Sequence, residues 1–230
     1  LVEGYLPGAE VAVEGFLRSG RLEILAIFDK PDPLEGPYFE ETLYVTPSRL
    51  AATVLADVER VTASAALALG LREGPIHAEL RVHEGNVSVL ELAARSIGGL
   101  CSRALRFGAG VSLEQLILRH ALGLSLEELP REPGAAGVMM IPIPRGGTLA
   151  QVDGQERARA VPGVGGVEIT IARGRPVIPL PEGDRYLGFV FAHGPTAAAV
   201  ERSLRQAHRC LDIRIEPPPA SIARGGGPLA

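Results

Sequence analysis

Two glutamates, Glu79 and Glu91, lie on neighbouring segments, the first of which alternates polar with apolar residues. The segments, residues 76–82 and 87–93, flank the turn sequence Glu84-Gly85-Asn86 and are typical of a β-hairpin. A hairpin centred on Gly85 places Glu79 directly opposite Glu91, with Cβ atoms about 4.5–5.5 Å apart. Two carboxylates so close repel each other unless a cation lies between them. The pattern therefore points to a site for a hard divalent cation such as Mg²⁺.

Further polar residues with the period of a strand extend this face of the hairpin. His77 and Arg81 flank Glu79, and Arg95 follows Glu91, with Val89 and Ala93 on the same side. The opposite side is predicted to face the core, because it carries Ile76, Ala78, Leu80, Val82, Leu90 and Leu92. We expect the polar side to be the open side of the sheet. The spacing is also typical of a solvated face with cross-strand charges, so both interpretations stay open here.

Lys30 is the only lysine of the chain, which otherwise uses arginine for its basic side chains. Arginine and lysine differ in shape and hydration, so a site that needs a compact ammonium group resists their exchange. We predict that Lys30 lies beside the acidic face rather than on open surface. Chance survival of one lysine is the alternative.

The rest of the first half indicates the elements that would position these side chains. Strands are predicted over residues 10–17 and 22–28, on either side of a tight turn, followed by a Pro-rich loop over 31–45. Thr46-Pro47 has the residue types of a helix start and predicts a helix from there to about Leu69. The capping-box sequence from Ser112 to Gln115 predicts a short helix that ends near Gly123.

The second half is predicted to be a small β-rich unit with one helix. Residues 130–136 have the composition of a linker, and residues 217–230 that of a disordered tail. Between them, short Val/Ile/Met runs predict strands over residues 137–143, 148–152, 167–172 and 187–192. A helix is predicted over residues 196–210 and a last strand over 212–216. The domain prediction is thus 1–129, a linker at 130–136, 137–216, and a tail at 217–230.

Composition narrows the class of protein. The chain has 230 residues, 46% of them hydrophobic, which is enough for a sizeable core. Its net charge of −4 argues against binding of nucleic acid through a cationic face. No run approaches about 18 apolar residues, so we expect no membrane span, and with two cysteines and no secretory signal we expect a cytoplasmic protein. The first residues look like a strand already under way, and we expect a preceding N-terminal part.

Four segments, taken in order, resemble the ATP-grasp enzymes, most closely the L-amino-acid ligase (dipeptide synthetase) branch. They are Glu3-Gly4-Tyr5-Leu6-Pro7-Gly8-Ala9-Glu10, Ile27-Phe28-Asp29-Lys30-Pro31, Gly74-Pro75-Ile76-His77-Ala78-Glu79, and Leu90-Glu91-Leu92-Ala93-Ala94-Arg95 with Gly98-Gly99. The resemblance implies an α+β fold: the C-terminal half of an ATP-grasp domain, an antiparallel sheet with helices, followed by a small β-rich domain. Residues 174–177 and 184–188 are similar to that second domain.

The resemblance also implies roles for single residues. Residues Glu3, Gly4, Tyr5 and Leu6 are similar to the segment that meets the adenine of ATP. Glu79 and Glu91 match the two acids that hold Mg²⁺, or Mn²⁺ in its place, on the ATP phosphates. Arg95 matches the arginine that steadies the transferred phosphoryl group. His77 lies where this branch has a histidine near the substrate, and Lys30 matches a recurrent lysine.

The implied activity is that of an ATP- and Mg²⁺-dependent carboxylate–amine ligase that works through an acyl-phosphate and joins amino acids. Its partners would be small carboxylate and amine substrates, with a homodimer left open, and we expect no turnover from this chain alone. Ala93 stands where many ATP-grasp enzymes carry a metal-binding asparagine, which argues against a carboxylase. The alternatives are a biotin-carboxylase-like or phosphoribosylamine-type ATP-grasp enzyme, or a non-catalytic nucleotide-binding module.

Overall fold

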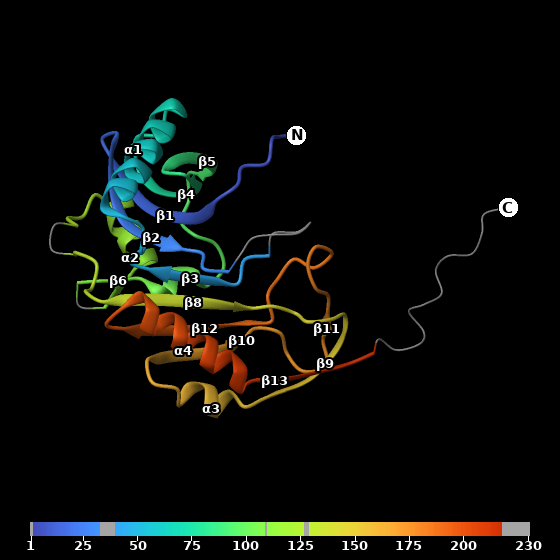
Figure 1. Ribbon diagram of the computed structural model, residues 1–230. Helices are drawn as coiled ribbons and strands as arrows, with labels where there is room; N and C mark the ends of the chain where they lie inside the picture. The colour runs from blue at the N-terminus through green and yellow to red at the C-terminus, as the bar shows by residue number, and fades with distance from the viewer. Residues whose placement is uncertain (1, 33–39, 109, 127–128, 218–230) are drawn as a thin grey trace.

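The computed structural model describes residues 2–32, 40–108, 110–126 and 129–217. Within these ranges the elements are β1 (Ala9–Arg18), β2 (Arg21–Asp29), β3 (Leu43–Thr46), α1 (Ala52–Ala68), β4 (Gly74–His83), β5 (Asn86–Ala93), the 3₁₀ turn η1 (Cys101–Ala104), β6 (Arg106–Phe107), β7 (Val111–Ser112), α2 (Leu113–Ala121), β8 (Ala135–Ile141), β9 (Gly147–Asp153), α3 (Gln155–Arg159), β10 (Val164–Ile169), β11 (Pro176–Val177), β12 (Gly188–Gly194), α4 (Ala197–Cys210) and β13 (Asp212–Glu216) (Figure 1). Within the same ranges, no helix combines the length and the apolar character that crossing a lipid bilayer requires.

An antiparallel sheet runs through the fold and includes strands from both halves of the chain. Among the described residues it has eight strands in the order β10-β12-β8-β3-β2-β1-β4-β5. Two smaller sheets have the orders β11-β9-β13 and β6-β7. The expected α+β fold with antiparallel sheets is confirmed.

One face of the large sheet is covered by α1 and α4, which lie near its two ends (Figure 1). At the β4–β5 end, Val58 of α1 packs with the buried side chains Val11, Val13, Ala78 and Leu80. At the other end, Val200 and Leu204 of α4 pack with side chains of β3, β8 and β12, among them Val45, Met139, Ile141 and Val190. Alternation along each strand sends the intervening residues to the opposite face.

That opposite face, called the site face below, gathers the charged residues of β1 and β4. Paired residues of an antiparallel sheet share a face, and the register pairs Glu10 with Arg81, Ala12 with Glu79 and Glu14 with His77. The site face is not open, and His77 and Arg81 are 4% and 6% exposed. Residues 97–101 and Glu41 lie beside His77, and Tyr5 and Leu6 of the N-terminal segment contact Arg81. The expectation of an open sheet side was wrong at these two residues.

The β4–β5 hairpin forms as predicted and pairs Glu79 with Glu91, but its register changes next to that pair. A β-bulge between Glu79 and Leu80 pairs Leu80 with Val89, one residue away from the register that a centre at Gly85 predicts. A one-residue slip exchanges the two faces of a strand. Val89 therefore packs with the α1 core, and Leu90 lies on the site face, which reverses the two predicted positions.

Two further expectations needed correction. Thr46 does not begin a helix: it is the last residue of β3, buried and paired with Ala136, and α1 begins only at Ala52. Sheet pairing across a long sequence separation overrides the local cap signal there, and it also places a strand in the predicted loop over 31–45. The second half contains α3 as well as the one helix predicted.

The division into domains stays a prediction, because the sheet runs across the expected linker. Backbone hydrogen bonds join the expected linker to the first half: Gly108 N–H donates to the Pro130 carbonyl, and Glu132 N–H donates to the Arg106 carbonyl. Ala135 and Ala136 of the expected linker already belong to β8. Of the expected tail, residues 218–230 lie outside the described residues.

Candidate active site

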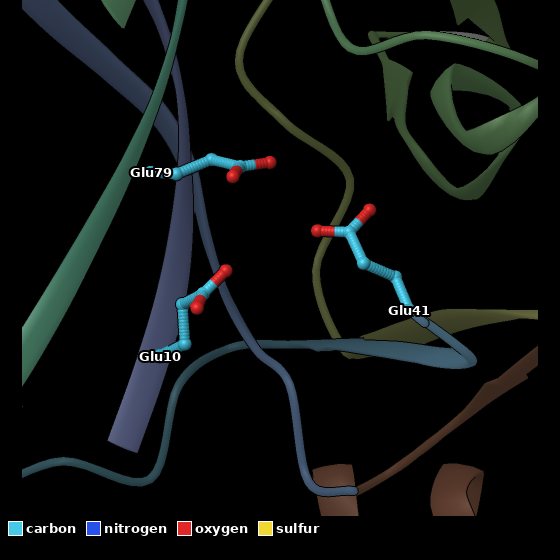
Figure 2. A group of neighbouring side chains, drawn as sticks. All are labelled: Glu10, Glu41 and Glu79. Atoms are coloured by element: carbon cyan, nitrogen blue, oxygen red, sulfur yellow. The ribbon is translucent and has the colours of Figure 1, made fainter. Parts of the chain in front are cut away.

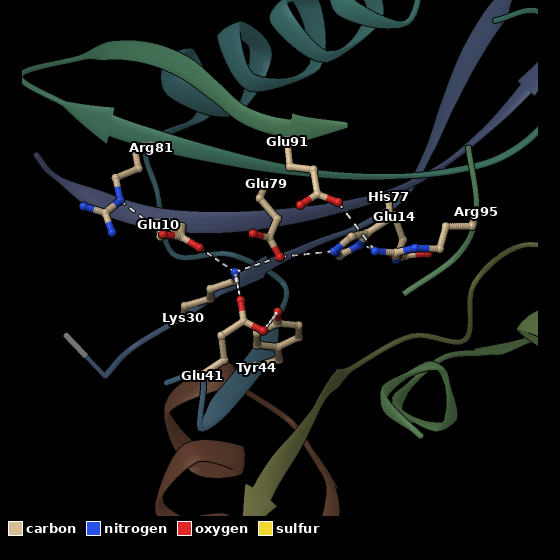
Figure 3. A network of polar contacts seen from close by, with 10 residues as sticks. All are labelled: Glu10, Glu14, Lys30, Glu41, Tyr44, His77, Glu79, Arg81, Glu91 and Arg95. Atoms are coloured by element: carbon tan, nitrogen blue, oxygen red, sulfur yellow. Dashed lines mark hydrogen bonds and ion pairs between the residues drawn. The ribbon is translucent and has the colours of Figure 1, made fainter. Parts of the chain in front are cut away.

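Lys30 is the centre of a buried charge network on the site face (Figure 3). Its ammonium nitrogen lies 2.6 Å from Glu10 Oε1 and 3.2 Å from Glu79 Oε1, and it also pairs with Glu41. The Lys30 side chain is only 2% exposed. Burial alone would lower the pKa of Lys30, but the charges of Glu41 and Glu79 outweigh it and raise that pKa. The prediction that Lys30 lies beside the acidic face is confirmed.

Three carboxylates surround this ammonium group and point toward one another (Figure 2). Glu10, Glu41 and Glu79 each offer an oxygen within 4.8 Å of the others. Carboxylate oxygens are the donors that Mg²⁺ prefers. Lys30 Nζ contacts all three residues and already supplies a positive charge between them, so a divalent cation would bind only to the oxygens that Lys30 does not contact. Glu91, predicted as a ligand with Glu79, is not in the group: its side chain is 60% exposed and lies 3.6 Å from Arg95.

His77 forms a second ionic chain beside the first (Figure 3). Its Nδ1 lies 2.5 Å from Glu14 Oε1, and its Nε2 lies 3.4 Å from Glu79 Oε1. Burial would lower the pKa of His77, but hydrogen bonds to Glu14 and Glu79 outweigh it and raise that pKa to about 9. Burial would raise the pKa of Glu79, but His77 and Lys30 lower it to about 2. At neutral pH the imidazolium of His77 therefore faces the ionised carboxylate of Glu79, while burial raises the pKa of Glu14 on its other side.

A cavity of about 510 Å³, called the first cavity, lies along the site face. Its lining includes all four residues of the segment predicted to meet adenine, Glu3, Gly4, Tyr5 and Leu6. The other lining residues are Glu10, Glu41, Glu79, Arg81 and Leu90. Pockets for small ligands are typically about 300–1,000 Å³, mostly apolar with a few placed polar groups. The first cavity, apolar at Tyr5 and Leu90 and acidic at Glu41 and Glu79, fits a nucleotide with a metal at its phosphate end.

A smaller cavity of about 250 Å³, called the second cavity, adjoins the first. Glu41 and Glu79 line both cavities. The second adds the cationic side chains of His77 and Arg95 to the aromatic and apolar side chains Tyr44, Ile97, Cys101, Met140, Tyr186 and Phe189. A ligand in the first cavity and a small anion in the second would therefore meet at two carboxylates.

Arg95 and Tyr44 both line the second cavity. The Arg95 side chain is 55% exposed, and its guanidinium lies 3.6 Å from Glu91 and donates to the Ser96 carbonyl. The Tyr44 hydroxyl donates to Glu41 Oε2 at 2.8 Å, and its ring lies beneath Lys30 Nζ. Burial and the charge of Glu41 raise the pKa of Tyr44. Arg95 is thus exposed enough to contact a ligand, and Tyr44 holds Glu41 in place.

Sequence reasoning missed several residues of this site. Glu10 and Glu14 carried a usable signal, since acids four residues apart on a strand share a face. Arg81 was placed on the polar face but given no role. Glu41 and Tyr44 carry no signal in the sequence, because residues 31–45 have the composition of a loop although β3 forms at their end.

Comparisons with known proteins agree with this geometry. Residues 1–104 match the family model of the ATP-grasp domain, and residues 139–216 match that of the L-amino acid ligase C-terminal domain 2. The chain is also 28% identical, over 150 residues, to a Sinorhizobium fredii protein described as uncharacterized protein y4rH, covering 65% of this chain and 31% of that protein.

Solved structures share the fold. The L-amino acid ligase from Bacillus licheniformis superposes with a TM-score of 0.79 at 28% identity, over 92% of this chain and 53% of that one. A phosphoribosylglycinamide synthetase from Anaerococcus prevotii gives 0.76 at 12% identity, over 92% and 55%. The biotin carboxylase from Campylobacter jejuni gives 0.66 at 16% identity, over 93% and 48%.

The chain spans 31% of the curated relative and about half of each of these solved chains. The two family models cover the N-terminal and C-terminal parts of the described structure separately. Together with the likeness to the L-amino acid ligase, they show that residues 1–104 are similar to the ATP-grasp domain and that residues 139–216 are similar to the C-terminal domain 2 of L-amino acid ligases.

Proposed function

We propose that this chain forms part of an ATP- and Mg²⁺-dependent ligase that joins the carboxylate of one amino acid to the amine of another through an acyl-phosphate. The observation that carries the proposal is the shared wall of the two cavities, where Glu41 and Glu79 line both. A nucleotide in the first cavity and a carboxylate in the second would bring the terminal phosphate and its acceptor together. The matched family models support the same activity.

In the first step, a carboxylate oxygen of the acid attacks the terminal phosphorus of ATP, and the bond to the β-phosphate oxygen breaks to release ADP. In the second step, the amine nitrogen attacks the acyl carbon, inorganic phosphate leaves and the nitrogen loses a proton. Phosphoryl transfer needs positioning and charge neutralisation more than covalent help from the protein. When bound, Mg²⁺ supplies part of that neutralisation.

The chain's own residues divide these tasks. Residues 3–6 would meet the base, and Glu79 would hold the metal together with Glu41 or Glu91. Arg95, exposed at the second cavity, would bind the phosphoryl oxygens, for which a planar guanidinium is well shaped. His77 lines the second cavity, but its two ring nitrogens already face Glu14 and Glu79, so it would contribute positive charge beside the acid rather than a direct hydrogen bond. Lys30 would keep the three surrounding carboxylates in place rather than meet substrate, since it is 2% exposed.

The second cavity also limits the acid. At about 250 Å³, with Met140, Ile97 and Phe189 in its lining, it suits one amino acid with a small or medium apolar side chain. Charged or very large side chains would leave a charge unpaired among these residues or would not fit.

The test is release of ADP by the intact protein with pairs of amino acids. We expect ADP release that needs both amino acids and Mg²⁺, and that falls when any one of these three components is left out. Release with bicarbonate alone would favour the carboxylase alternative. No release with any acceptor, while ATP still binds, would leave the non-catalytic module.

A further inference from the structure

We propose that Glu10 is a positioning residue that joins the two ends of the first cavity. Through Arg81 it holds the segment of residues 3–6, and through Lys30 it holds Glu41 and Glu79. The inference rests on the proposed function only in taking residues 3–6 as the part that meets the nucleotide. The contacts themselves are made between residues of this chain and do not involve a nucleotide.

Arg81 connects β4 to the N-terminal segment. Its Nη1 donates to the Leu6 carbonyl at 2.7 Å and to the Tyr5 hydroxyl at 3.2 Å, and its guanidinium lies 5.3 Å from the centre of the Tyr5 ring. Residues 2–7 belong to no helix or strand and are exposed along their length, with Tyr5 64% and Leu6 39% exposed. The buried guanidinium of Arg81 is therefore a firm attachment for an otherwise exposed segment.

Glu10 uses its two oxygens for two different cations. Oε1 accepts from Lys30 Nζ at 2.6 Å, and Oε2 accepts from Arg81 Nε at 3.1 Å. All three side chains are at most 7% exposed. A buried ion held on both sides in this way is costly to disturb, because removing it leaves two buried cations without compensation.

The chain of contacts thus runs from Tyr5 through Arg81, Glu10 and Lys30 to Glu79, one end of the first cavity to the other (Figure 3 shows all but Tyr5). Within this series of contacts, Glu10 is the residue that contacts both cations, Arg81 at one end of the cavity and Lys30 at the other. Loss of its charge should therefore disturb both ends, whereas a change at Arg81 should disturb mainly the segment of residues 3–6.

The chain offers a separate spectroscopic probe for each end. Lys30 is the only lysine, so ¹⁵N-lysine labelling reports one side chain, and 3-fluorotyrosine labelling reports Tyr5 among four tyrosines, assigned with Tyr5→Phe. The variants are Glu10→Gln and Arg81→Lys, which keeps the charge but cannot reach Glu10, Tyr5 and Leu6 together. The matched control is Glu23→Gln, an exposed acid of β2 that pairs with an exposed arginine.

We expect Glu10→Gln to shift both the Lys30 and the Tyr5 signals, Arg81→Lys to move the Tyr5 signal toward that of free fluorotyrosine, and Glu23→Gln to move neither. A folded Glu10→Gln variant whose Tyr5 signal is unchanged would overturn the proposal. If Glu10→Gln does not fold, Arg81→Lys decides: an unchanged Tyr5 signal would overturn it, and a shifted one would support it.

Binding of a fluorescent ATP analogue separates this inference from the proposed function. We expect Glu10→Gln and Arg81→Lys to weaken binding by about tenfold or more, a change of about 1.4 kcal/mol, and Glu23→Gln to leave it unchanged. A wild-type protein that binds no analogue would contradict the proposed function, while the two nucleotide-free signals would still test the role of Glu10. Tight binding by both folded variants would contradict the positioning role.

Discussion

Glu79 lies directly opposite Glu91 across the β4–β5 pair, yet the two carboxylates have different surroundings. Glu79 contacts Lys30 and His77 in the buried network, whereas Glu91 is 60% exposed and pairs only loosely with Arg95. The hairpin therefore carries a structural charge network on one strand and an exposed ion pair on the next. Substitutions in the two groups should have different consequences.

Lys30→Met should destabilise the fold strongly. The substitution leaves Glu10, Glu41 and Glu79 facing one another without their cation, and breaking a buried ion pair in this way costs about 3 kcal/mol or more. Arg60→Gln, which breaks an exposed pair with Asp57 on α1, is the control and should cost less than about 1 kcal/mol. The measurement is urea unfolding of both variants. Equal losses in the two would mean that Lys30 does not hold the network.

Stability should fall as pH rises from 6.5 to 9. The pKa of His77 is raised from 6.5 to about 9, so its charged form stabilises the fold fully below pH 6.5, and that contribution disappears as pH passes through 9. The loss is about 2–3 kcal/mol in free energy of unfolding. His77→Gln should flatten this slope, and His83→Gln, at an exposed histidine beside the turn, should keep it. A wild-type profile that is flat over this range would contradict the charge pairing.

The bulge in β4–β5 makes neighbouring residues respond differently. Val89→Ala removes apolar volume from the α1 core and should cost about 1 kcal/mol of unfolding free energy. Leu90→Ala, in the lining of the first cavity, should change stability less but weaken binding of an ATP analogue. Denaturant titration and binding measurements on the same two variants check this. If Leu90→Ala cost more stability and Val89→Ala weakened binding of the ATP analogue, the result would support the register without the bulge.

Much of the fold could be predicted from the sequence, and the failures have local causes. The alternation of residue types and the turn residues predict the hairpin and the pairing of Glu79 with Glu91. The place of Lys30 is predicted from its being the only lysine of the chain. The bulge left no signal, because Val89 and Leu90 are both apolar and suit either face. The sequence does not indicate β3, because the strand has only four residues and Thr46-Pro47 at its end has the residue types of a helix start. The residues that pair with it in β8 lie about ninety positions away. Without β3, Glu41 and Tyr44 could not be placed at the site.

Arg95 should affect the chemical step more than ATP affinity in the intact protein. Its guanidinium is exposed at the second cavity. In the proposed reaction it would follow the phosphoryl group as charge shifts onto the acyl-phosphate. An interaction that is stronger in the transition state lowers kcat when it is removed. Arg95→Ala should therefore reduce kcat, and Arg95→Lys should remain impaired because the planar fork is lost. An Arg95→Ala variant with normal kcat and a raised KM for ATP would assign the residue to nucleotide binding.

The most direct test of the account is the fate of oxygen from the acid. The intact protein is given ATP, an unlabelled amine partner and an amino acid carrying ¹⁸O in its carboxylate, and the released phosphate is analysed by mass spectrometry. The oxygen that attacks phosphorus leaves with the phosphate, so the account predicts one ¹⁸O atom in each phosphate formed. Phosphate without ¹⁸O, in the presence of the joined product, would contradict an acyl-phosphate and with it the proposed roles of Glu79 and Arg95.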